Sequence, residues 1–239
     1  MISGNGHDTS PLRWKKVCFS YYCQDPGPPS SSSQIATPAD FKARSGLGFI
    51  HLNVRSLLGK LDFVRIWASS TDADVIVLSE TWLNKSILAS DIALNGFNVY
   101  RTDRPNKGGG VAIYVKNKFS VTTLVSKSIS KQFEFLAINI EVAKGQQVMV
   151  VGCYRPPSAG KDSLSSLANL LSQLDYKEIV LLGDFNWDWL TAVSEDFKNL
   201  CISLNVTQIV DSPTRPNIKS PNKSSPIDLI LTNVPHKYS

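Results

Sequence analysis

The chain has 239 residues with a formal net charge of +5, and 42% of its residues are hydrophobic. This composition supports a globular core, and no apolar run approaches the ~18 residues that a membrane-spanning helix needs, so we expect no membrane partner. The N-terminal stretch MISGNGHDTSPLRWKK contains no apolar segment of the kind found in secretory signals. We therefore expect an intracellular protein, nuclear or cytoplasmic and not secreted.

The first part of the chain differs in composition from the rest. Residues 1–45 contain Pro26, Pro28, Pro29 and a serine run at 30–33. Such a segment buries little apolar surface, so we expect a disordered tail. The pattern of a folded domain begins at Gly46, and we assign residues 46–239 to that domain.

The folded pattern opens with strand, helix and strand. Residues 49–54 read as a strand that carries Asn53 near its end, and residues 75–78 read as a second strand that leads into Glu80. This order predicts a βαβ unit with parallel strands. Between the strands, apolar residues recur at helical spacing: Leu57, Leu58, Leu61, Val64 and Trp67.

The middle of the chain reads as antiparallel. Three glycines at 108–110 precede a strand at 111–115; they lack the Lys-Ser/Thr of a nucleotide-binding loop and indicate a tight entry into the strand. Residues 133–141 and 147–154 then predict a hairpin. Together with the parallel unit before it, the hairpin favours a two-sheet α/β sandwich with helices on the outer faces.

A second helix is predicted at 164–174, and it leads into the stretch IVLLGDFNWDW at 179–189. Ile179 to Leu182 form the short apolar run of a strand buried on both faces. Asp184 and Asn186 follow at i and i+2, so on an extended backbone their side chains would share one face. The alternative is that Gly-Asp-Phe-Asn is only turn chemistry.

The last elements are a helix at 197–204 and a strand at 227–232 that carries Asp228. With it, polar residues end or interrupt five apolar strands, which predicts a shared polar site at one edge of the sheets. Each residue has a plainer alternative: a helix cap for Glu80, a turn for Asn53, half-buried core for Tyr154 and a surface acid for Asp228. The five positions are Asn53, Glu80, Tyr154, Asp184 with Asn186, and Asp228.

Six short motifs follow one another along the chain. They are HLNVRSL at 51–57, LSETWL at 78–83, GGGVAIYV at 108–115, YRPP at 154–157, GDFN at 183–186 and IDLILTN at 227–233. In this order they resemble the endonuclease/exonuclease/phosphatase superfamily, and their sequences most resemble the apurinic-endonuclease-like domain of LINE-type, non-LTR retrotransposons. The resemblance covers about residues 46–239 and implies the four-layer α/β sandwich of the DNase I-like type.

The resemblance also implies a reaction, the metal-dependent hydrolysis of a DNA phosphodiester bond. Glu80 would hold Mg²⁺ (or Mn²⁺) with Asn53 close beside it, because carboxylate oxygen suits a hard cation. Asp184 would activate the attacking water or protonate the leaving oxygen. DNA is the implied partner, and continuity with a reverse transcriptase in a longer polyprotein is left open.

Four further residues receive roles from the same resemblance. Asn186 and Tyr154 would hold phosphate oxygens as charge builds in the transition state. Thr214, in the run SPTR, would contact the substrate backbone. Asp228 would orient a catalytic histidine, as the acid does in a hydrolase triad.

That histidine is where the sequence departs from the family. The family pattern continues to a Ser-Asp-His motif in a last core strand, which this sequence does not contain, and neither His51 nor His236 fits as its substitute. We therefore expect the 239-residue chain, expressed alone, to be inactive or nearly so. Two alternatives to the endonuclease stay open: an inactive, truncated retrotransposon remnant, and another phosphodiesterase or phosphatase of the superfamily.

Overall fold

The structure is a computed structural model, and it describes residues 47–210, 214 and 225–237. The predicted tail at 1–45 lies outside the described residues. The described helices are α1 (Leu61–Ser70), α2 (Asp162–Ser172) and α3 (Glu195–Ser203). Short 3₁₀ turns span Leu58–Lys60, Ser90–Ile92, Ala192–Ser194 and Pro235–Lys237.

The described strands form two sheets, one of four strands in the order β1-β2-β4-β3 and one of six in the order β5-β6-β7-β8-β10-β9. Both sheets are mixed, because β1 pairs in parallel with β2 and β7 with β8, while the other neighbours are antiparallel. The strands are β1 (Phe49–Asn53), β2 (Val75–Ser79), β3 (Phe97–Thr102), β4 (Val111–Lys116), β5 (Ser120–Ile129), β6 (Phe133–Ala143), β7 (Gln146–Tyr154), β8 (Ile179–Asp184), β9 (Thr207–Gln208) and β10 (Asp228–Thr232).

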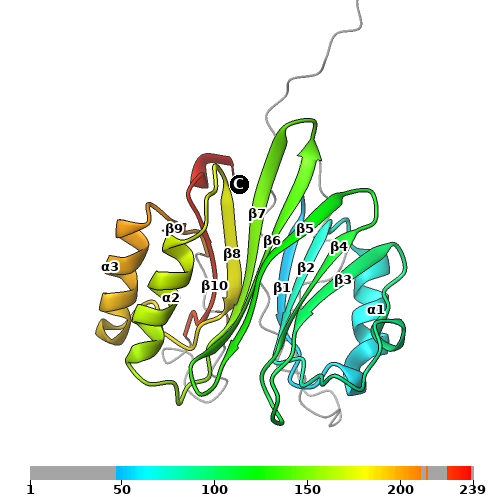
Figure 1. Ribbon diagram of the computed structural model, residues 1–239, viewed down its shortest axis with the longest axis horizontal. Coiled ribbons are helices and arrows are strands. Elements are labelled where there is room, and N and C mark those ends of the chain that lie inside the picture. The colour runs from blue at the N-terminus through cyan, green and yellow to red at the C-terminus, as the bar shows by residue number, and fades with distance from the viewer. Residues whose placement is uncertain (1–46, 211–213, 215–224, 238–239) are drawn as a thin grey trace, which may run out of the picture.

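The two sheets face each other between two layers of helices. Figure 1 shows α1 on the outer face of the four-stranded sheet, and α2 with α3 on the outer face of the six-stranded sheet. The α/β sandwich predicted from the sequence is confirmed, including its DNase I-like layering of helix, sheet, sheet and helix. The parallel pairing predicted for the first two strands is also confirmed.

Alternation along the central strands explains why the layers stack. In β2, Val75 and Val77 belong to the core between the sheets, whereas Ile76 and Leu78 belong to the core under α1. Successive side chains of a strand point to opposite faces, so an unbroken apolar run is what a strand buried on both faces requires. The core under α1 also receives the apolar stripe of that helix, which buries Leu61, Val64, Trp67 and Ala68.

The sequence analysis missed β3 and β5. Each is one of the two outer strands of its sheet in the described part of the chain. The outer strand β1 is buried along its whole length, whereas β3, with the sequence FNVYRT, and β5, with the sequence SVTTLVSKSI, consist mostly of exposed or half-exposed residues. They therefore lack the continuous apolar run by which the buried strands were found.

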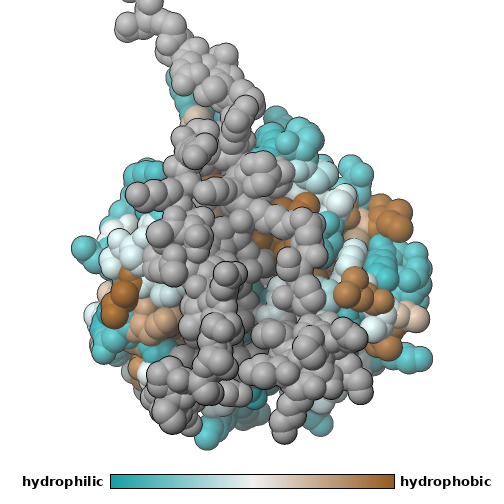
Figure 2. Space-filling model, turned by 180° about the vertical axis from the view of Figure 1, so that it is seen from behind, coloured by the Kyte–Doolittle hydropathy of each residue, from teal (hydrophilic) through white to brown (hydrophobic). Residues whose placement is uncertain are grey.

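The outer surface of the described residues carries scattered apolar side chains. Figure 2 shows separate brown areas among hydrophilic residues on one face. No helix among the described residues is long and apolar enough to span a bilayer. The large exposed apolar side chains are Leu58, Ile66, Leu88, Leu124, Leu190, Val193 and Ile202.

The pairing of β7 with β8 depends on the absence of a side chain at Gly183. A Cβ built there would lie 1.9 Å from the backbone oxygen of Cys153, so Gly183→Ala must displace a strand at the centre of the sheet. We expect a loss of about 1–3 kcal/mol in the free energy of unfolding, measured by urea denaturation. Gly59→Ala is the matched control, because a Cβ there meets no atom within 4 Å. Equal stability of the two variants would contradict the strand register described here.

Candidate active site

The register of the strands brings the polar positions to one end of the sandwich. Tyr154 and Asp184 are paired residues at the ends of the parallel strands β7 and β8. Asp228 opens β10 rather than ending it, but β10 is antiparallel to β8, so it pairs with Asp184 as well. In the other sheet Asn53 pairs with Ser79, the residue before Glu80.

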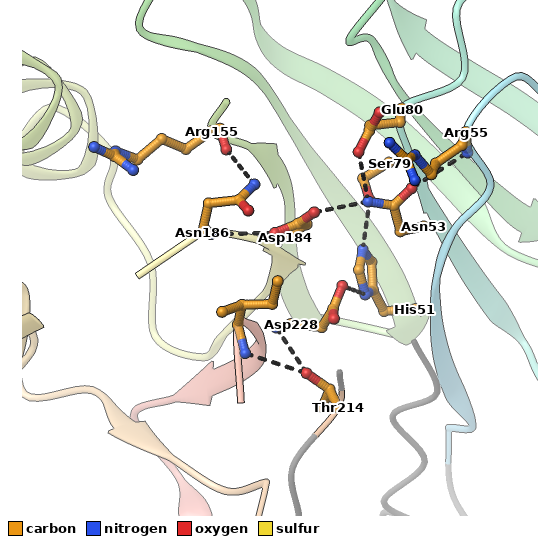
Figure 3. A network of polar contacts seen from close by, with 11 residues as sticks. His51, Asn53, Arg55, Ser79, Glu80, Arg155, Asp184, Asn186, Thr214 and Asp228 are labelled. Carbon is orange, nitrogen blue, oxygen red and sulfur yellow. Dashed lines mark hydrogen bonds and ion pairs between the residues drawn. The ribbon is translucent and has the colours of Figure 1, made fainter. Parts of the chain in front are cut away.

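The two sheets are joined at this end by the side chain of Asn53 (Figure 3). Its Nδ2 donates one hydrogen bond of 2.8 Å to Glu80 Oε1 and another of 2.7 Å to Asp184 Oδ2. Both hydrogens of the amide are used, and its Oδ1 accepts from the Arg55 backbone N–H at 3.2 Å. The carboxylates from two sheets therefore meet across a single nitrogen atom, as the sequence predicted for a shared site.

Burial dominates the electrostatics of Asp184, which is only 3% exposed. Burial raises its pKa well above the ordinary value, and the nearby carboxylate of Asp228 raises it further. The hydrogen bond from Asn53 acts in the opposite direction, because it stabilises the charged form. Asp184 therefore holds a proton more readily than an exposed aspartate does.

Glu80 follows β2 in a loop. The alternative that it caps a helix is wrong, because the next helical turn among the described residues begins at Ser90. Its carboxylate is half-buried, and Oε2 accepts a hydrogen bond of 3.3 Å from Trp82 Nε1. With Oε1 bonded to Asn53, both carboxylate oxygens are held in place while the group keeps contact with solvent.

Strained backbone gathers at the same loops. Non-glycine residues with positive φ cost free energy, and clusters of them occur where a site fixes an unfavourable conformation. Among the described residues, five of seven such positions lie at the ends of β1, β2 and β8: Arg55 (φ 39°), Ser56 (82°), Glu80 (54°), Trp82 (54°) and Asn186 (50°).

Asn186 does not continue the extended backbone of β8. Its positive φ turns the chain, its backbone N–H donates to Asp184 Oδ1 at 3.1 Å, and its Nδ2 donates to the Arg155 carbonyl at 2.7 Å. The expectation that alternation along a strand aligns the two side chains is therefore wrong, because the strand ends at Asp184. The alternative that Gly-Asp-Phe-Asn is only turn chemistry is not borne out either, because Gly183 and Asp184 belong to β8. The chain turns after Asp184, and this places Asn186 beside Asp184 (Figure 3).

Tyr154 is buried at the end of β7, as its core alternative proposed, and it also lies at the polar end of the strands. Burial raises the pKa of its hydroxyl, and the carboxylates of Glu80 and Asp184 add to the effect. Arg104 lies over the Tyr154 ring, 5.7 Å from the centroid, and is held by Glu134 through bonds of 2.8 and 2.9 Å. The sequence analysis missed this ion pair, although a glutamate inside the apolar strand FEFLAINI was a usable signal.

Asp228 faces a histidine of the other sheet. Its Oδ1 lies 3.5 Å from Nδ1 of His51, whose Nε2 is 3.1 Å from Ser79 Oγ. His51 is fully buried, and burial lowers its pKa to about 3, which favours the neutral ring.

Thr214 holds the start of β10. Its Oγ1 accepts hydrogen bonds from the backbone N–H groups of Ile227 and Asp228 at 3.2 and 3.0 Å.

A metal ion would find carboxylate oxygens here, but no closed protein cage. Within the described ranges, no group of three or more His, Cys, Asp and Glu side chains could by itself enclose a metal ion. Mg²⁺ commonly uses one or two carboxylates and completes its shell with water and substrate phosphate. The half-buried Glu80 carboxylate beside the Asn53 amide and Asp184 fits this open kind of site.

The raised pKa of Asp184 predicts how stability depends on pH. The folded chain binds this proton more tightly than the unfolded chain, so Asp184 lowers stability progressively as pH rises from about 4 through its folded-state pKa. The stability of Asp184→Asn relative to wild type should therefore increase between pH 4 and pH 8, measured by urea unfolding with EDTA present. Asp62→Asn, which removes an exposed carboxylate of α1, is the matched control for the substitution. A relative stability that falls with pH would contradict the assignment.

Comparisons with known proteins agree with this geometry. A profile described as "Endonuclease/Exonuclease/phosphatase family" matches residues 50–237. No match was found among curated proteins.

Several solved structures share the fold. An AP endonuclease from Archaeoglobus fulgidus has a TM-score of 0.56 at 15% identity, over 78% of this chain and 86% of that chain. The 3′ phosphatase NExo from Neisseria, bound to a product DNA hairpin, has a TM-score of 0.58 at 18% identity, over 76% and 84%. The human Nocturnin catalytic domain with bound sulfate has a TM-score of 0.54 at 15% identity, over 76% and 79%. These likenesses show the fold, and the profile match shows the membership: the chain belongs to the endonuclease/exonuclease/phosphatase family.

Proposed function

We propose that this domain hydrolyses DNA phosphodiester bonds with a divalent metal ion, as the nicking endonuclease domain of a LINE-type, non-LTR retrotransposon. The observation that supports hydrolysis is the pair of hydrogen bonds from the Asn53 amide, which hold the carboxylates of Glu80 and Asp184 together where the two sheets meet. Packing of the core does not explain two neighbouring carboxylates there, because burying like charges side by side is costly.

Glu80, with Asn53 beside it, is the proposed holder of Mg²⁺ or Mn²⁺. When bound, such an ion neutralises charge on the phosphate and orients the reacting oxygens. Both oxygens of Glu80 are already positioned by the donors on Asn53 and Trp82, so little reorganisation is needed to receive a cation. Partial exposure leaves room for the waters that Mg²⁺ retains.

Asp184 is the proposed proton-handling group. It accepts the proton of the attacking water or supplies one to the leaving oxygen, and its position between Asn53 and the Asn186 backbone N–H fixes both carboxylate oxygens. A fixed carboxyl group in hydrogen-bond reach of the reacting oxygen is the geometry that general acid–base catalysis requires. Asp228 is the proposed charge that orients a catalytic histidine. Its neighbour among the described residues, His51, is fully buried and is not given that catalytic role.

Asn186 and Tyr154 are the proposed contacts to the phosphate oxygens. One hydrogen of the Asn186 NH₂ group is bonded to the Arg155 carbonyl, and among the described residues no acceptor takes the second. The Tyr154 hydroxyl stays protonated because its pKa is raised, so it can donate to an anionic oxygen. Donors placed in advance stabilise charge as it develops on the phosphate. The expected backbone contact of Thr214 is a less direct proposal, because its oxygen already serves two backbone donors.

A basic rim supports DNA as the substrate. Because the strands at this end terminate together, their loops surround the site, and the loops after β1, β2, β3, β5 and β7 each contribute an exposed cation. Lys and Arg side chains of this kind bind phosphates without regard to sequence. The exposed basic residues on these loops are Arg55, Lys85, Lys107, Lys131 and Lys161.

The retrotransposon assignment rests on the amino-acid sequences of the motifs. HLNVRSL, LSETWL, YRPP and IDLILTN resemble the LINE-type domain more than other members of the superfamily. Continuity with a reverse transcriptase belongs to the same proposal. An inactive remnant and a phosphatase of the same family are the alternatives, and the following experiment separates them.

The test combines plasmid nicking with metal binding. With Mg²⁺, a form of the protein that also carries the family's Ser-Asp-His segment should convert supercoiled DNA to the open-circular form, and Glu80→Gln or Asp184→Ala should reduce the rate by about 10²–10⁴-fold. The 239-residue chain alone should nick DNA slowly or not at all. Mg²⁺ should also raise the melting temperature of wild type and not of Glu80→Gln, because only a bound ligand stabilises the folded state. Glu195→Gln, which removes an exposed carboxylate on α3, is the matched control for both readouts.

Each alternative has its own outcome. If Mg²⁺ raises the melting temperature and the protein releases phosphate from a 3′-phosphorylated oligonucleotide but does not nick plasmid DNA, the phosphatase is favoured. If Mg²⁺ leaves the melting temperature unchanged and no substrate is hydrolysed, the inactive remnant is favoured. Unchanged nicking by Glu80→Gln would refute the assigned metal site.

A further inference from the structure

Arg155 is a buried cation beside the candidate site, and none of the roles above uses its side chain. It is only 8% exposed. Among the described residues, its guanidinium hydrogen-bonds only to neutral oxygens, and no carboxylate forms an ion pair with it. Burying a charge in this way is costly, so the position calls for an explanation beyond packing.

The guanidinium spans the loop that follows β7. Nε donates to Ser163 Oγ at 3.1 Å, and Nη2 donates to the Ala159 carbonyl at 2.8 Å. Ser163 is fully buried at the start of α2, and its hydroxyl donates to the Gly160 carbonyl at 2.7 Å. The planar guanidinium, with its five N–H donors, can bind these acceptors in one rigid arrangement.

The same residue reaches across to the turn after β8. Its Nη1 lies 3.5 Å from the Phe185 carbonyl, and its guanidinium carbon lies 4.2 Å from the centroid of the Trp187 ring. Trp187 in turn stacks on Phe197 of α3 at 4.6 Å. The cation is thus anchored to both outer helices, through Ser163 and through Trp187.

The backbone of Arg155 completes the connection to the site. Its N–H donates to the Asp184 carbonyl at 2.9 Å, and its carbonyl accepts the Asn186 Nδ2 at 2.7 Å. Pro156 follows, and a residue before proline is restricted to extended conformations, which limits the direction of that carbonyl. Arg155 therefore contacts three consecutive residues of the turn, in which Asn186 has the strained φ of +50°.

We propose that Arg155 is a positioning residue, whose buried guanidinium fixes the carbonyl that aims the Asn186 amide at the substrate phosphate. The proposal rests on the proposed function for the role of Asn186. Without the guanidinium and its hydrogen bonds, the Arg155 carbonyl and the strained backbone at Asn186 would change conformation together, and the Asn186 amide would no longer point toward the phosphate. The residue contacts no substrate itself.

The expected kinetic effect follows from this indirect action. Arg155→Met should lower kcat for Mg²⁺-dependent nicking by about tenfold to a hundredfold, the cost of a misplaced catalytic group, and leave KM nearly unchanged. Arg155→Lys should behave similarly, because one ammonium group cannot reproduce the planar fork. Arg65→Met, which removes a guanidinium from the exposed face of α1, is the matched control and should keep full activity.

A double-mutant cycle separates positioning from general destabilisation. In an Asn186→Ala background, Arg155→Met should cost less than about threefold in kcat, because the group through which it acts is gone. A cost equal to that in wild type would overturn the proposal, and so would full activity of Arg155→Met alone.

The second measurement does not depend on hydrolysis. In ¹⁵N–¹H spectra of the full chain, the side-chain NH₂ signals of Asn186 should shift in Arg155→Met and Arg155→Lys and stay unchanged in Arg65→Met. If the form that carries the Ser-Asp-His segment hydrolyses no phosphodiester, the proposed function fails, while these signals, measured on the 239-residue chain, still test the positioning. Asn186 signals identical to wild type in a folded Arg155 variant would refute the inference. If Arg155→Met does not fold, Arg155→Lys carries both measurements.

Discussion

The arrangement of the site depends on one amide group. Asn53 belongs to the four-stranded sheet and Asp184 to the six-stranded sheet, and the 2.7 Å bond between them joins the two halves of the sandwich at the polar end. Its second bond, to Glu80, adds the loop after β2. A charged donor would neutralise these carboxylates, whereas a neutral amide orients them and leaves their charge available for a cation and a proton.

The cost of this arrangement is distributed over the surrounding fold. Asp184 is buried beside other carboxylates, which raises its pKa, and the loops that carry Glu80 and Asn186 adopt left-handed backbone conformations. Such features destabilise a protein unless the surrounding structure fixes them. Here the layered cores fix the strands, and the loops are fixed by specific donors and acceptors such as Trp82 and Arg155.

Much of this was predictable from the sequence. The central strands were found because each is buried on both faces and so forms an unbroken apolar run, and the polar residues beside those runs did converge in Asn53, Glu80 and Asp184. The outer strands β3 and β5 were missed because water on one side leaves no such run.

The parts of the site that were not foreseen depend on contacts between distant residues. The fork of Arg155 meets acceptors from α2 and from the turn after β8, and no spacing in the sequence encodes that meeting. The pairing of His51 with Asp228 likewise joins opposite sheets. Local patterns specify which residues end a strand, whereas the packing of the two sheets decides which of them meet.

The most direct test of the central claim is the position of a bound cation. In crystals of the chain soaked with Mn²⁺, anomalous scattering should show an ion about 2.0–2.2 Å from a Glu80 carboxylate oxygen, on the side where Asn53 and Asp184 lie. That result would establish the joined carboxylates as a metal-dependent site. An ion bound elsewhere, with the Glu80 carboxylate uncoordinated, would contradict the account.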